Sequence, residues 1–183
     1  MRDPSASPEF SKAFSGKIWI LGDDIDTDLI VPSRVLTEQD PKKLLDATLE
    51  VVIPNFAKLV TPGDIMVAGR NFGCGSSREE AVFVLKSLGI HVVIARSFPR
   101  IFYRNMINLG LIPLIVLDLV TDVTRKQSTL GGQGDLIQID LPSGKIWHHN
   151  QSACIQFPPF PTFIQDLLAA GGALAKLKQS LTK

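Results

Sequence analysis

Four short apolar runs punctuate the first two thirds of the chain. They lie at residues 17–21, 64–68, 91–95 and 111–117. Each has the length of a buried strand. Residues 81–88, after the second run, carry the apolar spacing of a half-buried helix, and residues 97–110 predict another helix before the fourth. Strand, helix and strand in this order predict a right-handed parallel crossover, so we expect an α/β fold.

The last third of the chain predicts a hairpin and a broken helix. Residues 134–141 alternate between apolar and polar side chains, and residues 142–145 turn the chain back into residues 146–149. Residues 163–177 are helical in spacing but contain Gly171 and Gly172. Without a repeat or a second domain in view, we expect a single domain over residues 16–183.

The first residues differ in composition from the rest. Pro4, Pro8 and several small residues precede Phe10, which predicts a flexible N-terminal segment over residues 1–15. This composition is also typical of an added leader, so the segment is left out of the fold prediction. The segment has no signal-peptide core, and no apolar run reaches the roughly 18 residues of a membrane span.

The highest density of potentially functional side chains occurs between a predicted strand and a predicted helix. It is found at residues 71–80, Asn-Phe-Gly-Cys-Gly-Ser-Ser-Arg-Glu-Glu. Gly73 and Gly75 allow a positive φ or a close approach to a ligand. A helix start offers free backbone N–H groups, and two hydroxyls and Arg78 add further donors. The stretch therefore predicts a site for a carboxylate or phosphate. The alternative is that Ser76 or Ser77 only caps the helix, with Glu79 or Glu80 three residues on.

Three common motifs for phosphate binding, dinucleotide binding and serine hydrolysis do not match this stretch. No lysine follows a glycine, which excludes a P-loop. The third glycine of a dinucleotide fingerprint falls on Arg78, and Ser76 lacks the flanking glycines of a hydrolase nucleophile. What remains is a serine among positive groups, which suits proton removal from a carboxylate-bearing substrate.

Residues 22–28, Gly-Asp-Asp-Ile-Asp-Thr-Asp, form a second polar stretch. Its alternating aspartates resemble a calcium loop, but Leu29 stands where such a loop needs glycine and Val35 where it needs glutamate. We therefore expect no metal site here. The aspartates either form a solvated turn or, for Asp28 nearest the apolar run, contribute to a site.

The net charge and the cysteine content bear on the possible partners and on the cellular setting. The net charge of +1 gives no field that would attract nucleic acid, so no such partner is expected. The two cysteines, Cys74 and Cys154, form no C-x-x-C pair, which favours a reducing, cytoplasmic setting. Cys74, between two glycines, is either a reactive thiol of lowered pKa or a small buried filler.

Several motifs together resemble one family. Residues 71–79, residues 95–105 and residues 110–113 closely resemble the small subunit of 3-isopropylmalate dehydratase, which corresponds to the swivelling domain of the aconitases. Residues 22–28 with Pro32-Ser-Arg34 match the family's other signature. The resemblance runs from about residue 16 to the C-terminus, and it implies a single β/β/α swivelling domain of a leucine-biosynthesis hydro-lyase.

The resemblance also implies roles for individual residues. Ser76 matches the family's catalytic base, and Ser77 and Arg78 match its contacts to the substrate carboxylate. Arg34 matches a second substrate arginine, and Asp28 matches an active-site acidic residue. In such an enzyme iron polarises the substrate hydroxyl while the serine removes a proton from carbon.

The cofactor and partner follow from the same resemblance. This chain is expected to bind no cofactor and to close over a large subunit that carries a 4Fe-4S cluster. The substrate is expected to be a small 2-hydroxy di- or tricarboxylate, and no membrane is involved.

The substrate within that class is left open by two departures. Glu80 replaces the family's usual histidine, and residues 35–39 lack its usual tyrosine. Homoaconitase and 2,3-dimethylmalate dehydratase are therefore alternatives to isopropylmalate dehydratase. A non-catalytic carboxylate- or phosphate-binding module is the alternative from another class, and a catalytic site would require Arg34 and Arg78 to converge.

Overall fold

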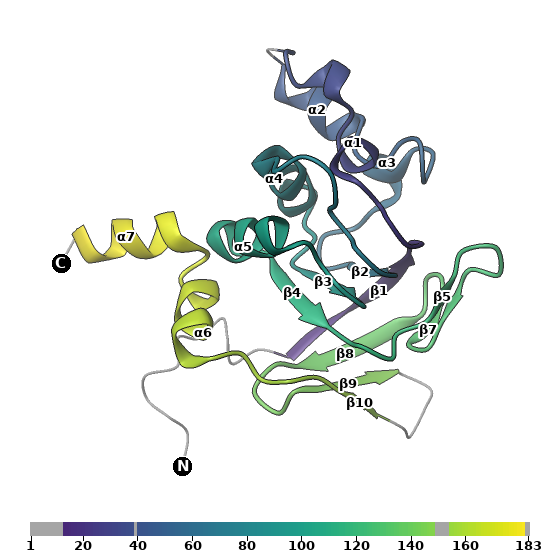
Figure 1. Ribbon diagram of the computed structural model, residues 1–183, viewed down its shortest axis with the longest axis vertical. Helices are drawn as coiled ribbons and strands as arrows, with labels where there is room; N and C mark the ends of the chain where they lie inside the picture. The colour runs from purple at the N-terminus through teal and green to yellow at the C-terminus, as the bar shows by residue number, and fades with distance from the viewer. Residues whose placement is uncertain (1–12, 39, 149–153, 182–183) are drawn as a thin grey trace.

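A seven-stranded sheet forms the centre of the fold in the computed structural model, which describes residues 13–38, 40–148 and 154–181 (Figure 1). The strand order is β10-β9-β8-β1-β2-β3-β4. Pairs from β1 to β4 are parallel, and pairs from β1 through β8 to β10 are antiparallel. The strands are β1 (Ala13–Ile20), β2 (Ile65–Ala68), β3 (Val92–Ala95), β4 (Ile112–Ile115), β8 (Leu136–Asp140), β9 (Lys145–His148) and β10 (Cys154–Gln156). The four predicted parallel strands and the predicted hairpin are therefore confirmed.

Strand β1 joins the parallel half of the sheet to the antiparallel half. Residues 13–17 pair with β8, whereas residues 18–20 pair with β2. The strand begins at Ala13, so residues 13–15 of the expected flexible segment belong to the sheet, because they pair with Gln138, Ile139 and Asp140. Residues 1–12, the remainder of that segment, lie outside the described residues.

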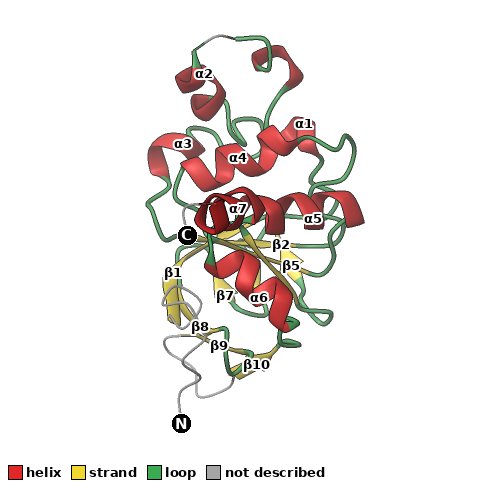
Figure 2. Cartoon of the chain, turned by 90° about the vertical axis from the view of Figure 1, so that its left-hand side faces the viewer, coloured by secondary structure: helices red, strands yellow, loops and turns green. Residues whose placement is uncertain are grey.

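The helices cover the two faces of the sheet (Figure 2). They are α1 (Thr27–Ile30), α2 (Pro41–Asp46), α3 (Phe56–Leu59), α4 (Glu79–Ser87), α5 (Arg100–Leu109), α6 (Thr162–Ala169) and α7 (Ala173–Leu181), with a 3-10 turn at Ser33–Val35. A small three-stranded sheet contains β5 (Thr121–Asp122), β6 (Gln127–Ser128) and β7 (Gly131–Gly132). Figure 2 shows α1 to α4 on one side of the strands and α6 on the other.

Two hydrophobic cores lie on the opposite faces of the sheet. Met66 and Ala68 of β2 pack into the core shared with α1, α3, α4 and α5, and Ile65 and Val67 pack into the other. Successive side chains of a strand point to opposite faces, so a strand buried on both faces has no polar position. All four residues of β2 are indeed buried.

Glycine and proline set several boundaries as the sequence predicts. Helix α4 is followed by Gly89 and α5 by Gly110, both at positive φ. Helices α6 and α7 are separate because Gly171 and Gly172 also take positive φ. Pro113 lies in β4, at the edge of the sheet, where a missing N–H donor is tolerated.

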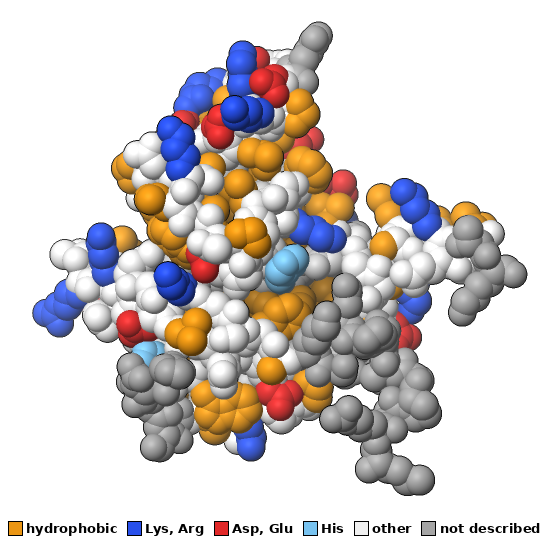
Figure 3. Space-filling view, turned by 180° about the vertical axis from the view of Figure 1, so that it is seen from behind, with side chains coloured by type: hydrophobic (Ala, Val, Ile, Leu, Met, Phe, Trp, Pro, Cys, Tyr) orange, Lys and Arg blue, Asp and Glu red, His pale blue; other side chains and the backbone are white. Residues whose placement is uncertain are grey.

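The surface charge is mixed in sign. Figure 3 shows acidic and basic side chains side by side at the end of the molecule that carries α2. No helix in the described part of the chain has the length and apolarity needed to cross a membrane.

Candidate functional site

Three loops meet beyond the carboxyl ends of the parallel strands β1, β2 and β3. Their backbones continue the pairing of the strands: the Asp24 N–H donates to the Arg70 carbonyl at 2.8 Å, and the Gly73 N–H to the Ile25 carbonyl at 2.7 Å. The third loop joins them where the Arg96 N–H donates to the Gly69 carbonyl at 3.1 Å. Ligands of open α/β sheets bind in this position, outside the strand carboxyl ends.

Thr27 fixes the backbone on which Ser76 lies. Its N–H donates to the Cys74 carbonyl at 2.9 Å, and its hydroxyl donates to the Ser76 carbonyl at 3.2 Å. Thr27 is fully buried, which shields these bonds from water. The aspartate turn and the glycine loop, far apart in sequence, are thereby held against each other.

The loop after β3 supports the glycine loop from the other side. The Ser97 hydroxyl accepts the Asn71 N–H at 2.9 Å, and the Ser97 carbonyl accepts the Phe72 N–H at 3.1 Å. The Phe72 ring packs edge-on against Phe98 and Phe102. A serine at the start of the predicted helix over residues 97–110 suggests a cap, but α5 has Pro99 at its N-cap and Ser97 binds the glycine loop instead.

The two loop glycines are required for different reasons. Gly73 and Gly75 both have positive φ, as predicted. A side chain at Gly73 would also collide with the Phe102 ring, so its close approach is to the core and not to a ligand. The space beside Gly75 is open enough for a side chain, and only its φ favours glycine.

Ser76 and Ser77 are not helix caps. Helix α4 begins at Glu79 with Arg78 at its N-cap and without a side-chain cap bond, so the capping interpretation is wrong. Both serines are exposed, and within the described residues neither hydroxyl has a hydrogen-bond partner. Two exposed hydroxyls without a partner among the described residues therefore lie in the loop directly before Arg78 in the sequence.

Arg78 is held by the aspartate turn. Its Nη1 donates to Asp28 Oδ1 at 2.8 Å and its Nη2 to Asp28 Oδ2 at 3.2 Å. Nη2 also donates to the Ser33 hydroxyl at 3.1 Å and Nη1 to the Val31 carbonyl at 3.4 Å. Four of the five guanidinium donors are thus satisfied, and Nε–H alone has no acceptor among the described residues.

Asp28 is ionised in this arrangement. The hydrogen bond from Arg78 and a short one from the Ser33 hydroxyl lower the pKa of Asp28 to about 2. A carboxyl group with this pKa donates no proton near neutral pH. Asp28 therefore acts as the anion that orients Arg78.

Arg34 binds a different carboxylate from the one that binds Arg78. Its guanidinium forms an ion pair with Glu50, and its side chain is 61% exposed. The expected convergence of Arg34 and Arg78 is not seen in the bonds of the described residues, although Ser33 in contact with Arg78 is the neighbour of Arg34. No sequence motif marks Glu50, and Ser33 lies inside the Pro-Ser-Arg signature, where only the arginine was assigned a role.

The surroundings of Cys74 do not favour a reactive thiolate. Burial raises the pKa of its thiol, and the charges of Asp26 and Asp24 raise it further. Cys74 is only partly buried and belongs to neither hydrophobic core, so the alternative of a small buried filler is not confirmed either.

An iron-sulfur cluster does not fit the donors of this chain. Such clusters are held by cysteine thiolates, commonly four. The chain has two cysteines: Cys74 lies in the glycine loop after the inner strand β2, whereas Cys154 lies in the edge strand β10. In the described part of the chain, no three His, Cys, Asp or Glu side chains gather as a metal site would require.

Comparison with known proteins identifies one family to which the chain is similar. The family model of the aconitase C-terminal domain matches residues 32–118. The chain is 46% identical over 167 residues to the 3-isopropylmalate dehydratase small subunit of Nautilia profundicola, covering 91% of this chain and 95% of that protein. It is 45% identical over 163 residues to the small subunit of Halothermothrix orenii, covering 89% and 94%.

A solved structure supports the fold independently. The crystal structure of 3-isopropylmalate dehydratase from Methanocaldococcus jannaschii matches with a TM-score of 0.80 and 40% identity, over 93% of this chain and 96% of that one. The expected fold class, a single α/β domain of the aconitase C-terminal type, is therefore confirmed. On these similarities, which span nearly its whole length, the chain belongs to the family of 3-isopropylmalate dehydratase small subunits.

Proposed function

We propose that this chain, as the small subunit of a 3-isopropylmalate dehydratase, supplies the proton-transfer group and a carboxylate contact for the isomerisation of 2- and 3-isopropylmalate. The observation that carries the proposal is the position of Ser76, whose free hydroxyl lies in an open loop two residues from the oriented guanidinium of Arg78. As a hydro-lyase, the enzyme removes water from a 2-hydroxy acid and adds it back in the other orientation.

Ser76 is the proposed base. A serine hydroxyl is weakly acidic and removes a proton from carbon only where positive groups stabilise its alkoxide. Arg78 supplies such a charge, and the backbone around Ser76 is fixed by Thr27. The proton leaves the substrate carbon next to its carboxylate and returns to the other carbon after the alkene has been repositioned.

Arg78 and Ser77 are the proposed carboxylate contacts. Asp28 occupies the end of the guanidinium through both Nη atoms. The side formed by Nε–H and the second hydrogen of Nη2 is then available, once the Ser33 hydroxyl gives up its 3.1 Å bond. A substrate carboxylate on that side receives two parallel hydrogen bonds while Asp28 continues to hold the arginine.

Arg34 is proposed as the contact to the second carboxylate. It is bound to a carboxylate of its own chain, Glu50, and has to exchange that partner for the substrate. The exchange is assigned to closure of the complex, since an exposed ion pair is worth only about 0–1 kcal/mol.

The partner is proposed to be a large subunit that carries a 4Fe-4S cluster, which supplies Lewis-acid polarisation of the substrate hydroxyl. This chain's own donors do not fit the cluster, and its contribution is confined to Ser76, Ser77, Arg78, Asp28 and Arg34. The cytoplasm is the proposed location, since the two cysteines form no disulfide pair.

The test is reconstitution with the large subunit and a substrate panel of 2-isopropylmalate, homocitrate and 2,3-dimethylmalate. We expect the highest kcat/KM on 2-isopropylmalate. A higher value on another substrate would assign the chain to homoaconitase or dimethylmalate dehydratase. Binding of these acids without turnover of any of them would favour a non-catalytic carboxylate-binding module.

A further inference from the structure

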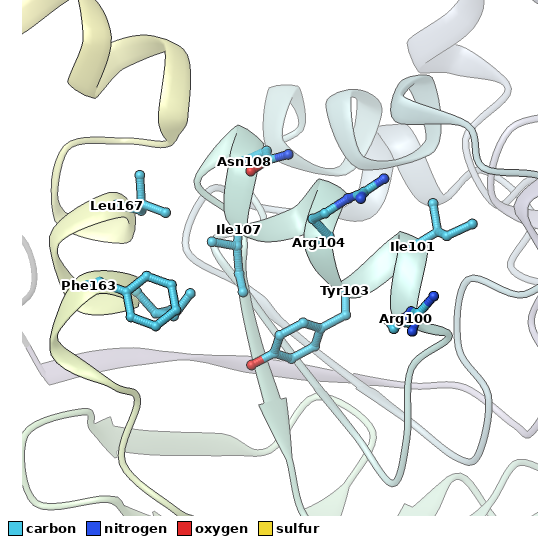
Figure 4. A pocket seen from close by; sticks show the side chains of 9 residues that line it. Arg100, Ile101, Tyr103, Arg104, Ile107, Asn108, Phe163 and Leu167 are labelled. Atoms are coloured by element: carbon cyan, nitrogen blue, oxygen red, sulfur yellow. The ribbon is translucent and has the colours of Figure 1, made fainter.

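A groove runs between α5 and α6, outside the site described above (Figure 4). It encloses about 540 Å³. Figure 4 shows Phe163 and Leu167 of α6 facing Tyr103 and Ile107 of α5 across this space. Phe163 is 63% exposed and Ile101 is 46% exposed, so both apolar side chains are accessible to a partner at the groove. We call this feature the α5–α6 groove.

The rim of the groove is basic. Arg100 and Arg104, one helical turn apart on α5, are exposed and have no carboxylate partner among the described residues. Arg100 is also the first residue of α5, where the helix dipole is positive and disfavours a cation. The chain as a whole carries a net charge of only +1, so the excess of positive charge at Arg100 and Arg104 is local. The groove therefore presents an apolar floor beside uncompensated positive charge.

The N-terminal end of α5, which lines the groove, directly follows the loop that supports the candidate site. Ser97 binds the backbone of the glycine loop, and Arg100 follows three residues later at the start of α5. Any partner that completes the site over the carboxyl ends of β1 to β3 reaches this end of α5. A second copy of this chain is a poorer occupant, because a two-fold contact through this face would bring the two arginine pairs together.

We propose that the α5–α6 groove docks a segment of the large subunit that places apolar side chains between the two helices and carboxylates on Arg100 and Arg104. The inference rests on the proposed function, because it needs that partner. The pair of arginines then contributes both to affinity and to the rate of association.

The test compares binding of the purified large subunit to wild type, to R100E/R104E and to a control, K17E/K58E. Lys17 and Lys58 are exposed on β1 and α3, outside the groove, and their reversal changes the net charge equally. We expect Kd to rise at least tenfold for R100E/R104E, with a weaker salt dependence, and less than threefold for the control. Phe163→Ala should raise Kd severalfold without altering the salt dependence.

An R100E/R104E complex as tight as the control, with both chains folded by circular dichroism, would overturn the inference. So would a wild-type dimer that the double variant dissociates while its affinity for the large subunit stays unchanged. The two proposals can fail separately. Turnover of the wild-type complex tests the proposed function, whereas Kd of the variants tests the groove.

Discussion

Asp28 and Arg78 are 50 positions apart and form a two-pronged ion pair, with Nη1 to Oδ1 at 2.8 Å and Nη2 to Oδ2 at 3.2 Å. The pair joins the aspartate turn after β1 to the start of α4. On the other side of the guanidinium, Nη2 donates to the Ser33 hydroxyl and Nε–H has no acceptor among the described residues. The proposed carboxylate contact of Arg78 would use that side.

Replacing Asp28 should reveal its positioning role. We expect Asp28→Ala to raise KM about 10- to 100-fold in the complex with the large subunit, since a charge-assisted hydrogen bond is worth about 1.5–3 kcal/mol. Asp28→Asn can keep one bond to Arg78 and should lose less. Steady-state kinetics measure both, and the idea is wrong if KM stays unchanged while only kcat falls.

The ionisation of Asp28 gives a prediction that needs no partner. Its pKa is lowered from 3.8 to about 2, so the folded chain binds this proton less readily than the unfolded chain does. The stability that the pair contributes is therefore present above pH 3.8 and is lost as the pH falls toward 2. Carbon-13 NMR titration should give a pKa near 2 for Asp28, and Ser33→Ala should raise it. A value at or above 3.8 would argue against the ion pair in solution.

Thr27 should affect turnover as well as stability. Thr27→Val removes the hydroxyl that holds the Ser76 carbonyl, and we expect about 1 kcal/mol loss in the free energy of unfolding and a tenfold lower kcat. Thr48→Val is the matched control, because Thr48 is equally buried and its hydroxyl donates to the Leu44 carbonyl within a turn. Equal effects of both variants on kcat would show that Thr27 has no positioning role.

The sequence predicts those parts of the fold that local patterns determine. The parallel strands follow from apolar runs, and helix ends follow from Gly89 and Gly110 because only glycine readily takes their positive φ. The small sheet of β5, β6 and β7 went unpredicted, since strands of two residues leave no periodic pattern. The apolar run predicts that β1 starts at residue 17, whereas the strand starts at Ala13. Residues 13–16 join the sheet by pairing with β8, and this non-local interaction leaves no local sequence pattern.

Two sequence motifs single out Ser76, Arg78 and Asp28 as candidate site residues. The structure joins two of them, Arg78 and Asp28, in an ion pair. The sequence left capping open as an alternative for the two serines, because the same residues suit a helix start and a ligand loop, and the structure excludes that alternative. The partner of Arg34, Glu50, could not be found from sequence, since a surface ion pair depends on side-chain geometry that no spacing records.

Turnover by Ser76→Ala, set beside Ser77→Ala in complexes with the large subunit, tests the central proposal most directly. Both residues are exposed and neither caps α4, so neither change should disturb folding or assembly. We predict that Ser76→Ala lowers kcat by at least a thousandfold with the complex intact, whereas Ser77→Ala mainly raises KM. Wild-type kcat in an intact Ser76→Ala complex would contradict the assignment of Ser76 as the base.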